Sequence, residues 1–208
     1  AWEENEFDEL EHFYSEVLRW YSVLCIPAIL GLVLLAGPIL RLISTSTIVL
    51  KGKSIIPVIA VAFAIEGLAN FLSYPLAAAE RTKLIAMITA VAGIVNIIFN
   101  ITLIPTIGLI GAALATAVAF GVRTTLLYKY STTYVSLSLP IMGLVYSGTA
   151  TSVMTISLFI LPIVSWYWKL ILFPPVGGLI FCVTFVMIGG LREKDQIRVH
   201  NILDRILM

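Results

Sequence analysis

The chain has 208 residues; 60% of them are hydrophobic, only 12% are charged, and the formal net charge is +1. A soluble domain has about a quarter of its residues charged, and a fold of this length could not cover its surface with so little polarity. The composition therefore excludes a soluble domain and predicts an integral membrane protein, and the near-neutral charge gives no basis for a nucleic-acid partner.

The first segment, residues 1–19, is acidic and amphipathic. Seven of the first twenty residues are Asp or Glu, and apolar side chains recur between them at helical spacing. This pattern predicts an amphipathic helix at the inner membrane surface, and a docking surface for another part of the same protein suits the acids equally well. Because the chain starts with Ala1 and not with Met, we expect it to be part of a longer protein.

Six apolar segments follow, and each is long enough to cross a membrane, since a spanning helix needs about 20 apolar residues. They lie at approximately 20–43, 55–78, 84–104, 107–128, 140–163 and 168–190. The sequence thus predicts an all-α membrane protein with a six-transmembrane-helix bundle over residues 20–190 and a short tail at 191–208.

Basic residues are divided unevenly between the two sides that six crossings define. Nine Lys and Arg residues fall on the side of the two termini and four fall on the other side. Because basic residues are retained in the cytoplasm, both ends of the chain are expected to be cytoplasmic, in a multi-pass protein of the plasma membrane.

The second predicted span contains an acid, Glu66, near its middle. An ionisable side chain at this depth costs about 2.5–3.5 kcal/mol and indicates a functional site by default. Asn70 and Tyr74 follow at i+4 and i+8, so the three residues share a polar stripe that must face protein or a cavity. Glu66 could remain protonated and donate a hydrogen bond, pair with a cation, or shuttle a proton.

Arg123 in the fourth predicted span is the nearest candidate cation for Glu66. At about 1.5 Å per residue, it lies roughly 8 Å closer to the cytoplasm than Glu66. An arginine can extend across part of that distance, or it can direct its guanidinium group to the lipid headgroups. The sequence leaves both arrangements open: pairing with Glu66 or a substrate, and contact with headgroups.

Asn96 and Asn100 lie four residues apart on one face of the third predicted span. An unpaired amide in hydrocarbon is unfavourable. Two interpretations remain: the amides form interhelical hydrogen bonds, each contributing about 0.6–2 kcal/mol, or they line a polar route for a hydroxyl-rich substrate.

The junction between the third and fourth spans contains Pro105 and Gly108. Pro105 lacks an amide donor and disfavours helical backbone at Ile104, so the third helix is predicted to end there and to form a tight antiparallel hairpin with the fourth. Small residues then repeat every four positions, with Gly108, Ala112 and Thr116 on one stripe and Gly111, Ala115 and Ala119 on another. Small residues at this spacing let helices approach closely in lipid, which predicts that the fourth helix packs on two sides.

Motifs for enzyme chemistry are missing from the sequence. It contains no P-loop, no HExxH and no GxSxG pattern, and these are the patterns that would indicate a nucleotide motor, a zinc peptidase or a serine hydrolase. His12 and His200 have no partner at ligand spacing. The sequence therefore predicts neither an enzyme nor a metal or cofactor site.

The stretch NIIFNITLIPTIGLIGAALAT, residues 96–116, resembles the signature of the Wzx-like oligosaccharide flippases of polysaccharide biosynthesis. The segments 26–44, 79–83 and 189–203 resemble further parts of that family in the same order, so the resemblance covers essentially the whole chain.

This resemblance implies the C-terminal part of a fourteen-helix transporter of the MOP exporter superfamily, with the six spans as its ninth to fourteenth helices. It implies flipping of a polyprenyl-linked oligosaccharide across the plasma membrane for glycan export. The partners would be the lipid-linked oligosaccharide, membrane lipid and the missing N-terminal helices of the same protein. Coupling to a proton or sodium gradient is compatible with this function, and Glu66 is the buried acid available for it.

Other functions remain open on the residues alone. An ion-coupled multidrug (MATE-like) exporter of the same superfamily would need acids on helices outside this chain. A non-transporting membrane scaffold would use its buried amides for packing only. A polytopic transferase is a more distant alternative, because no connection between the spans is long enough for a catalytic domain.

Overall fold

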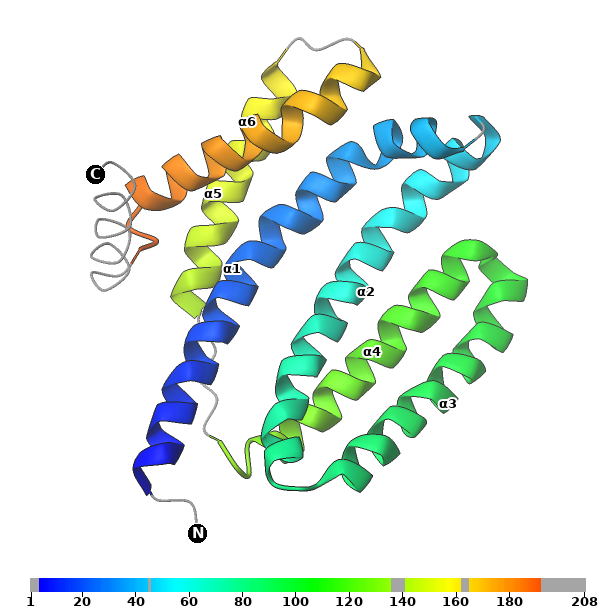
Figure 1. Cartoon of the computed structure of the whole chain (residues 1–208). Coiled ribbons are helices and arrows are strands. Elements are labelled where there is room, and N and C mark those ends of the chain that lie inside the picture. The colour runs from blue at the N-terminus through cyan, green and yellow to red at the C-terminus, as the bar shows by residue number, and fades with distance from the viewer. Residues whose placement is uncertain (1–3, 45, 136–140, 162–164, 192–208) are drawn as a thin grey trace.

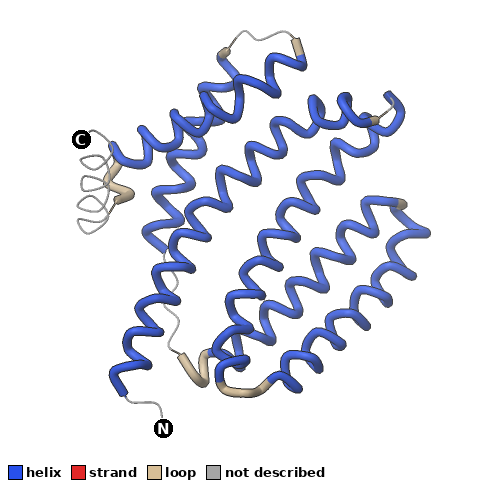
Figure 2. Tube along the Cα trace, viewed as in Figure 1, coloured by secondary structure: helices blue, strands red, loops and turns tan. Residues whose placement is uncertain are grey.

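The computed structural model of the chain describes residues 4–44, 46–135, 141–161 and 165–191. These residues form α1 (Glu4–Ile43), α2 (Ser46–Ala78), α3 (Thr82–Ile107), α4 (Leu109–Ser131), α5 (Ile141–Ile160) and α6 (Trp166–Met187). Each helix contains a segment long and apolar enough to cross a membrane. The described residues outside the helices form short stretches at the helix ends (Figure 2). The prediction of an all-α membrane protein with six spanning helices is confirmed.

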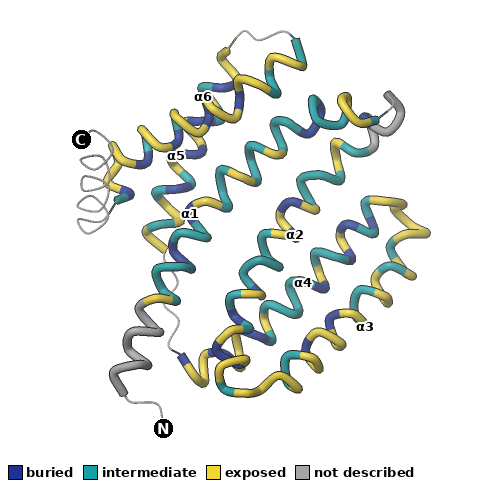
Figure 3. Tube along the Cα trace, in the orientation of Figure 1, coloured by how far each residue is buried: buried dark blue, intermediate teal, exposed yellow. Residues whose placement is uncertain are grey.

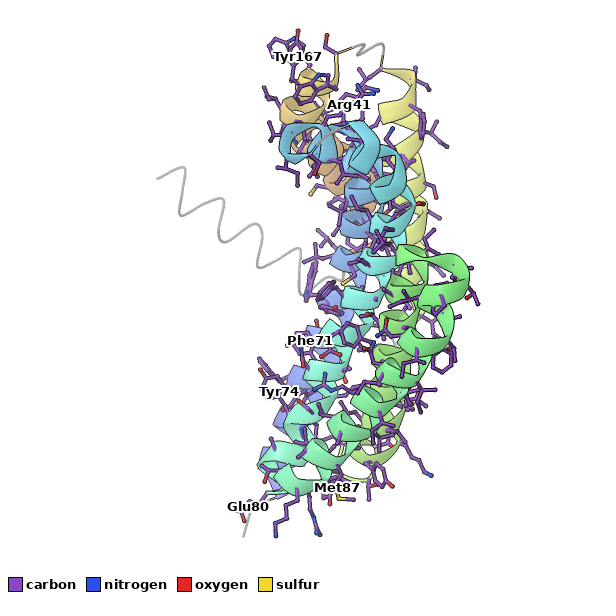
Figure 4. The ribbon with its side chains drawn as sticks, turned by 90° about the vertical axis from the view of Figure 1, so that its right-hand side faces the viewer. Arg41, Phe71, Tyr74, Glu80, Met87 and Tyr167 are labelled. Carbon is purple, nitrogen blue, oxygen red and sulfur yellow. The ribbon has the colours of Figure 1, made fainter. Side chains whose placement is uncertain are left out.

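The helices stand side by side in a row (Figure 1). α3 lies at one end of the row and packs on α4, which packs on α2; α2 packs on α1, and α1 packs on the α5–α6 pair at the other end. Seen from the side, the helices form a thin, curved layer (Figure 4). Most helices therefore keep part of their apolar surface free to meet lipid or other helices.

Two groups of buried apolar side chains join neighbouring helices, one in each half of the row. One joins α1, α5 and α6 through Val23, Ala150, Met154, Leu158, Phe173, Phe181 and Phe185. The other joins α2, α3 and α4 through Ala69, Leu72, Leu76, Ile88 and Leu127. Figure 3 shows the buried positions between neighbouring helices, whereas α3 at the end of the row is largely exposed.

Two buried serines connect neighbouring helices through the main chain. Ser131 of α4 donates its hydroxyl to the carbonyl oxygen of Leu72 on α2. Ser147 of α5 donates to the carbonyl oxygen of Val23 on α1 at 2.5 Å. Both serines are fully buried, and a hydroxyl without a partner in an apolar surrounding is unfavourable. Each of these two hydrogen bonds therefore favours one relative placement of the two helices that it joins.

The small residues of α4 let it lie between two neighbours. Gly111 is buried, and a Cβ atom there would lie 2.5 Å from the carbonyl oxygen and 2.6 Å from the carbonyl carbon of Leu103 on α3. Ala115 is also buried, while Ala112 and Thr116 are half-buried. Thr116 donates its hydroxyl to the carbonyl oxygen of Ala112 at 3.0 Å. The closest approach of α3 and α4 thus depends on the missing side chain at Gly111.

Pro105 does not end α3, contrary to the prediction. The helix continues through Pro105 to Ile107, and the chain turns at Gly108, whose φ is +66°. Pro105 lies in the last turn, where its missing donor removes a single helical hydrogen bond. Gly108 ends the helix because this left-handed backbone conformation is readily adopted by glycine. The predicted tight hairpin of α3 and α4 is present.

The two other marked differences from the prediction concern helix starts. α1 runs without a break from Glu4 to Ile43, so residues 4–19 and the first span form one helix. α2 begins at Ser46, so residues 46–54, which lie between the first two predicted spans, are helical. Lysine is a good helix former, and a spanning helix can continue beyond the hydrocarbon. The surface location of residues 1–19 stays a prediction, and the tail from residue 192 lies outside the described residues.

The close contact between α3 and α4 predicts that even an alanine side chain at position 111 lowers the stability of the protein. We expect Gly111→Ala to destabilise the protein by about 1–3 kcal/mol, because the new methyl group meets backbone atoms that cannot rotate away. The matched control is Gly121→Ala on the same helix, where a Cβ atom would meet nothing within 4 Å. It should be neutral or stabilising by up to about 1 kcal/mol. Thermal unfolding in detergent, followed by circular dichroism, measures both; equal effects would contradict the close contact.

Candidate functional site

The candidate site is built around two charged residues in the middle of the helix row. Glu66 lies on α2 and Arg123 on α4, and Arg123 Nη1 donates to Glu66 Oε1 in a salt bridge. The same nitrogen donates to Asn70 Oδ1 at 3.2 Å. The Arg123 side chain is 12% exposed and that of Glu66 is 22% exposed. Of the two arrangements that the sequence left open for Arg123, the structure has the one in which it pairs with Glu66.

A third helix contributes to the site through Thr89 of α3. Arg123 Nε lies 3.4 Å from Thr89 Oγ1 and donates to it, and Thr89 in turn donates to the carbonyl oxygen of Ile85 at 2.9 Å. Arg123 therefore links α2, α3 and α4. Thr89 was not among the site residues predicted from the sequence, although it precedes Asn96 by seven residues and so lies on the same helical face.

Flanking helices fix the rotation of α2 just before Glu66. The Tyr21 hydroxyl of α1 donates to the carbonyl oxygen of Ala64 at 2.6 Å, and the Thr124 hydroxyl of α4 donates to that of Ile65 at 3.1 Å. A Cβ atom at Gly67 would collide with the Tyr21 hydroxyl group. Glycine at this position lets α1 approach α2 closely, and the two hydrogen bonds direct Glu66 toward α4.

The ion pair is the most stable way to keep either charge at this depth. Each ionisable side chain costs about 2.5–3.5 kcal/mol in the middle of a membrane helix. Removing one partner of a buried pair typically destabilises a protein by about 3–5 kcal/mol, because the other charge is left uncompensated. Replacement of either residue alone is therefore expected to lower the stability of the protein.

One carboxylate oxygen of Glu66 is not used by the pair. Within the described part of the chain, Oε2 is buried and has no hydrogen-bond partner. A buried carboxylate oxygen of this kind can accept a proton or bind a cation. The site thus combines a guanidinium contact on one carboxylate oxygen with a second oxygen that is buried and, among the described residues, unpaired.

The two asparagines of α3 pair with each other. Asn100 Nδ2 donates to Asn96 Oδ1 at 2.8 Å, and both residues are half-buried. The structure therefore pairs these two amides along α3, whereas the first of the two interpretations drawn from the sequence expected their hydrogen bonds to reach another helix. Side chains at i and i+4 on a helix are close enough to satisfy each other in this way. A polar route along this face stays a prediction.

Tyr74 continues the stripe of Glu66 and Asn70 along α2 but does not join the charged pair. Its side chain is 56% exposed and points away from the helix row (Figure 4). Asn70 is also exposed, although its amide oxygen contacts Arg123. The structure thus brings together Glu66, Asn70 and Arg123 and leaves Tyr74 outside the cluster.

Among the described residues, no three His, Cys, Asp or Glu side chains lie close enough together to hold a metal ion. The chemistry available at the site is therefore that of one acid, one guanidinium group and nearby amides and hydroxyls. Such groups can bind an anion or a hydroxyl-rich molecule and can exchange a proton.

Comparison with known proteins gives consistent matches. The chain is 28% identical over 133 residues to the "Probable low-salt glycan biosynthesis flippase Agl15" of Haloferax volcanii, covering 64% of this chain and 28% of that protein. A solved structure of the lipid II flippase MurJ in an inward closed conformation has the same fold, with a TM-score of 0.76 and 21% identity. That match covers 88% of this chain and 40% of the MurJ chain.

The chain thus spans less than half the length of either relative. The resemblance to a flippase family of the MOP superfamily, read from residues 96–116, is confirmed by these matches. The sequence model described as "Lipid II flippase MurJ" matches residues 1–187, which is most of the chain. The chain therefore belongs to the family of the lipid II flippase MurJ.

Proposed function

We propose that this chain is part of a transporter that moves a polyprenyl-linked oligosaccharide from the cytoplasmic to the outer leaflet of the plasma membrane, for glycan export. The family match over residues 1–187 is the observation that carries the proposal, and the Haloferax volcanii relative is described as a probable glycan biosynthesis flippase. The distribution of basic residues supports an orientation with both ends of the chain in the cytoplasm.

Helices outside this chain would complete the transport path. The chain covers 28% and 40% of its two relatives. Its row of helices leaves many residues exposed (Figure 3), and large hydrophobic side chains are among them. Transport would proceed by rocking of two groups of helices around a central site, as in other transporters built from repeated halves. The polar cluster of α2, α3 and α4 would form part of that site.

Glu66 would couple transport to an ion gradient. Its Oε1 is paired with Arg123, and its Oε2 has no hydrogen-bond partner among the described residues. Protonation of Glu66 would remove the negative charge and release the guanidinium group for an anionic part of the substrate; a sodium ion at Oε2 is the alternative coupling ion. This scheme requires no cofactor.

The family match favours a flippase over the multidrug exporter considered from the sequence. Experiment must separate the flippase from the non-transporting scaffold, because a scaffold would need the same Glu66–Arg123 and Asn96–Asn100 pairs for stability alone. The two predictions below separate stability from transport.

We expect Glu66→Gln in the intact protein to lower flipping of a lipid-linked oligosaccharide in proteoliposomes by about tenfold or more, the loss that corresponds to roughly 1.4 kcal/mol. Glutamine keeps the size of the side chain and can accept a hydrogen bond from Arg123, but it carries no charge and cannot take up a proton. Membrane insertion, measured as the amount of protein extracted from the membrane fraction, should be retained.

The control is the double variant Glu66→Gln/Arg123→Gln. It removes both charges, so no uncompensated charge remains and the melting temperature should recover relative to Glu66→Gln. Flipping should stay low. A Glu66→Gln protein that transports at the parent rate would rule out coupling through Glu66.

The asparagine pair gives a second test against the scaffold alternative. We expect Asn96→Ala/Asn100→Ala to reduce flipping while the melting temperature falls only slightly, because an intramembrane hydrogen bond of this kind contributes about 0.6 kcal/mol. Thr102→Ala on the same helix is the control, since its hydroxyl bonds only to backbone oxygens of α3. Loss of folded protein without a separate transport defect would favour the scaffold.

A further inference from the structure

One end of the helix row carries positive charge without any acid. Arg41 lies at the end of α1, Lys53 near the start of α2 and Lys169 near the start of α6. Arg41 and Tyr167 mark this end in Figure 4, opposite Glu80 in the α2–α3 turn. The sequence has no Asp or Glu at residues 17–65 or 81–192, so no acid occurs in the segments that form this end.

The three cations line a single cavity of about 530 Å³ between α1, α2, α5 and α6. Gly37 makes room for one of them, because a Cβ atom there would lie 2.6 Å from Lys53 Cε and 3.1 Å from Lys53 Nζ. Lys169 Nζ lies 5.8 Å from the centre of the Phe173 ring. The rest of the wall includes Val33, Leu34, Phe159 and Trp166.

A cavity with this lining fits an anion joined to an apolar chain. Like charges around one space repel each other, and an anion placed between them relieves the repulsion. Arginine and lysine bind phosphate groups through strong charge-assisted hydrogen bonds. The apolar wall and Trp166 suit the part of a lipid that joins its headgroup to its chain, since tryptophan favours the membrane–water interface.

We propose that this cavity binds the phosphate headgroup of a lipid, on the side of the membrane predicted to be outer. The proposed function indicates which lipid supplies this phosphate. It is the phosphate linkage of the transported oligosaccharide lipid, which the cavity binds after the lipid has crossed the membrane. Arg41, Lys53 and Lys169 bind the phosphate oxygens, and the site lies on α1, α2 and α6, separate from the Glu66–Arg123 pair. The source assignment rests on the proposed function, whereas the phosphate site itself rests on the cavity.

Binding is tested with the intact protein in micelles of a non-ionic detergent, which contains no phosphate. Native mass spectrometry counts the bound molecules and gives affinities for three probes: farnesyl diphosphate, phosphatidylglycerol and inorganic phosphate. The test variant is Arg41→Gln/Lys53→Gln/Lys169→Gln. The control is Lys129→Gln at the exposed end of α4, which also removes a positive charge but lies outside this cavity.

We expect the parent to bind farnesyl diphosphate and the triple variant to bind it about tenfold or more weakly, the order expected when hydrogen bonds between charged groups are lost. Lys129→Gln should bind like the parent, and affinity should fall as salt is raised. Circular dichroism checks folding, and Lys53→Gln alone should show part of the loss if the triple variant is unstable. Lys53→Arg should retain binding because it keeps the charge.

The three probes separate the sources of the phosphate. Tighter binding of farnesyl diphosphate than of phosphatidylglycerol supports the transported lipid as the source. Equal binding of both, lost together in the triple variant, supports the site with bulk anionic lipid as its ligand, and comparable binding of inorganic phosphate indicates a free anion. Parent-like binding of all probes by the folded triple variant, or no binding by the parent, overturns the site. A parent that binds but does not flip the oligosaccharide lipid overturns the proposed function alone.

Discussion

The structure depends on the requirement that polar groups within hydrocarbon be satisfied by other protein groups, because lipid offers them no hydrogen bonds. Arg123 meets this requirement by contacting Glu66, Asn70 and Thr89 on two other helices. The buried serines meet it by donating to the main chain of a neighbouring helix. In each case the polar contact also fixes how one helix lies against the next, so the apolar helices acquire a definite arrangement.

Small residues complement these polar contacts. Gly111 brings α4 against the backbone of α3, and Gly67 brings α1 against α2 beside the Tyr21 hydroxyl. Close approach of helices shortens the distance that a polar side chain must span, which places the Arg123 guanidinium group within reach of α2. The close packing of the helices and the charged site therefore depend on each other. A helix that moved during transport would have to exchange polar partners as well as apolar contacts.

The sequence predicted the six spans and the inward position of Glu66, because hydrophobic length and the cost of a buried charge are local properties. It did not decide the partner of Arg123, since that depends on the register of α2 against α4. It placed a helix end at Pro105, whereas the turn occurs where Gly108 adopts a positive φ. Thr89 was missed because its role comes from contact with α4. For Asn96 and Asn100, bonds to another helix and a polar route were both considered from the sequence, whereas the structure pairs the two amides along α3.

The central claim is that the opposite charges of Glu66 and Arg123 hold α2 and α4 together within the membrane. Exchange of the two charges tests it most directly, with Glu66→Arg and Arg123→Glu made separately and together and the melting temperature measured in detergent. Each single exchange places like charges side by side and should sharply reduce the yield of folded protein. The double exchange restores an opposite pair and should recover folded protein beyond the sum of the two single effects. A double variant no more stable than that sum would contradict the account.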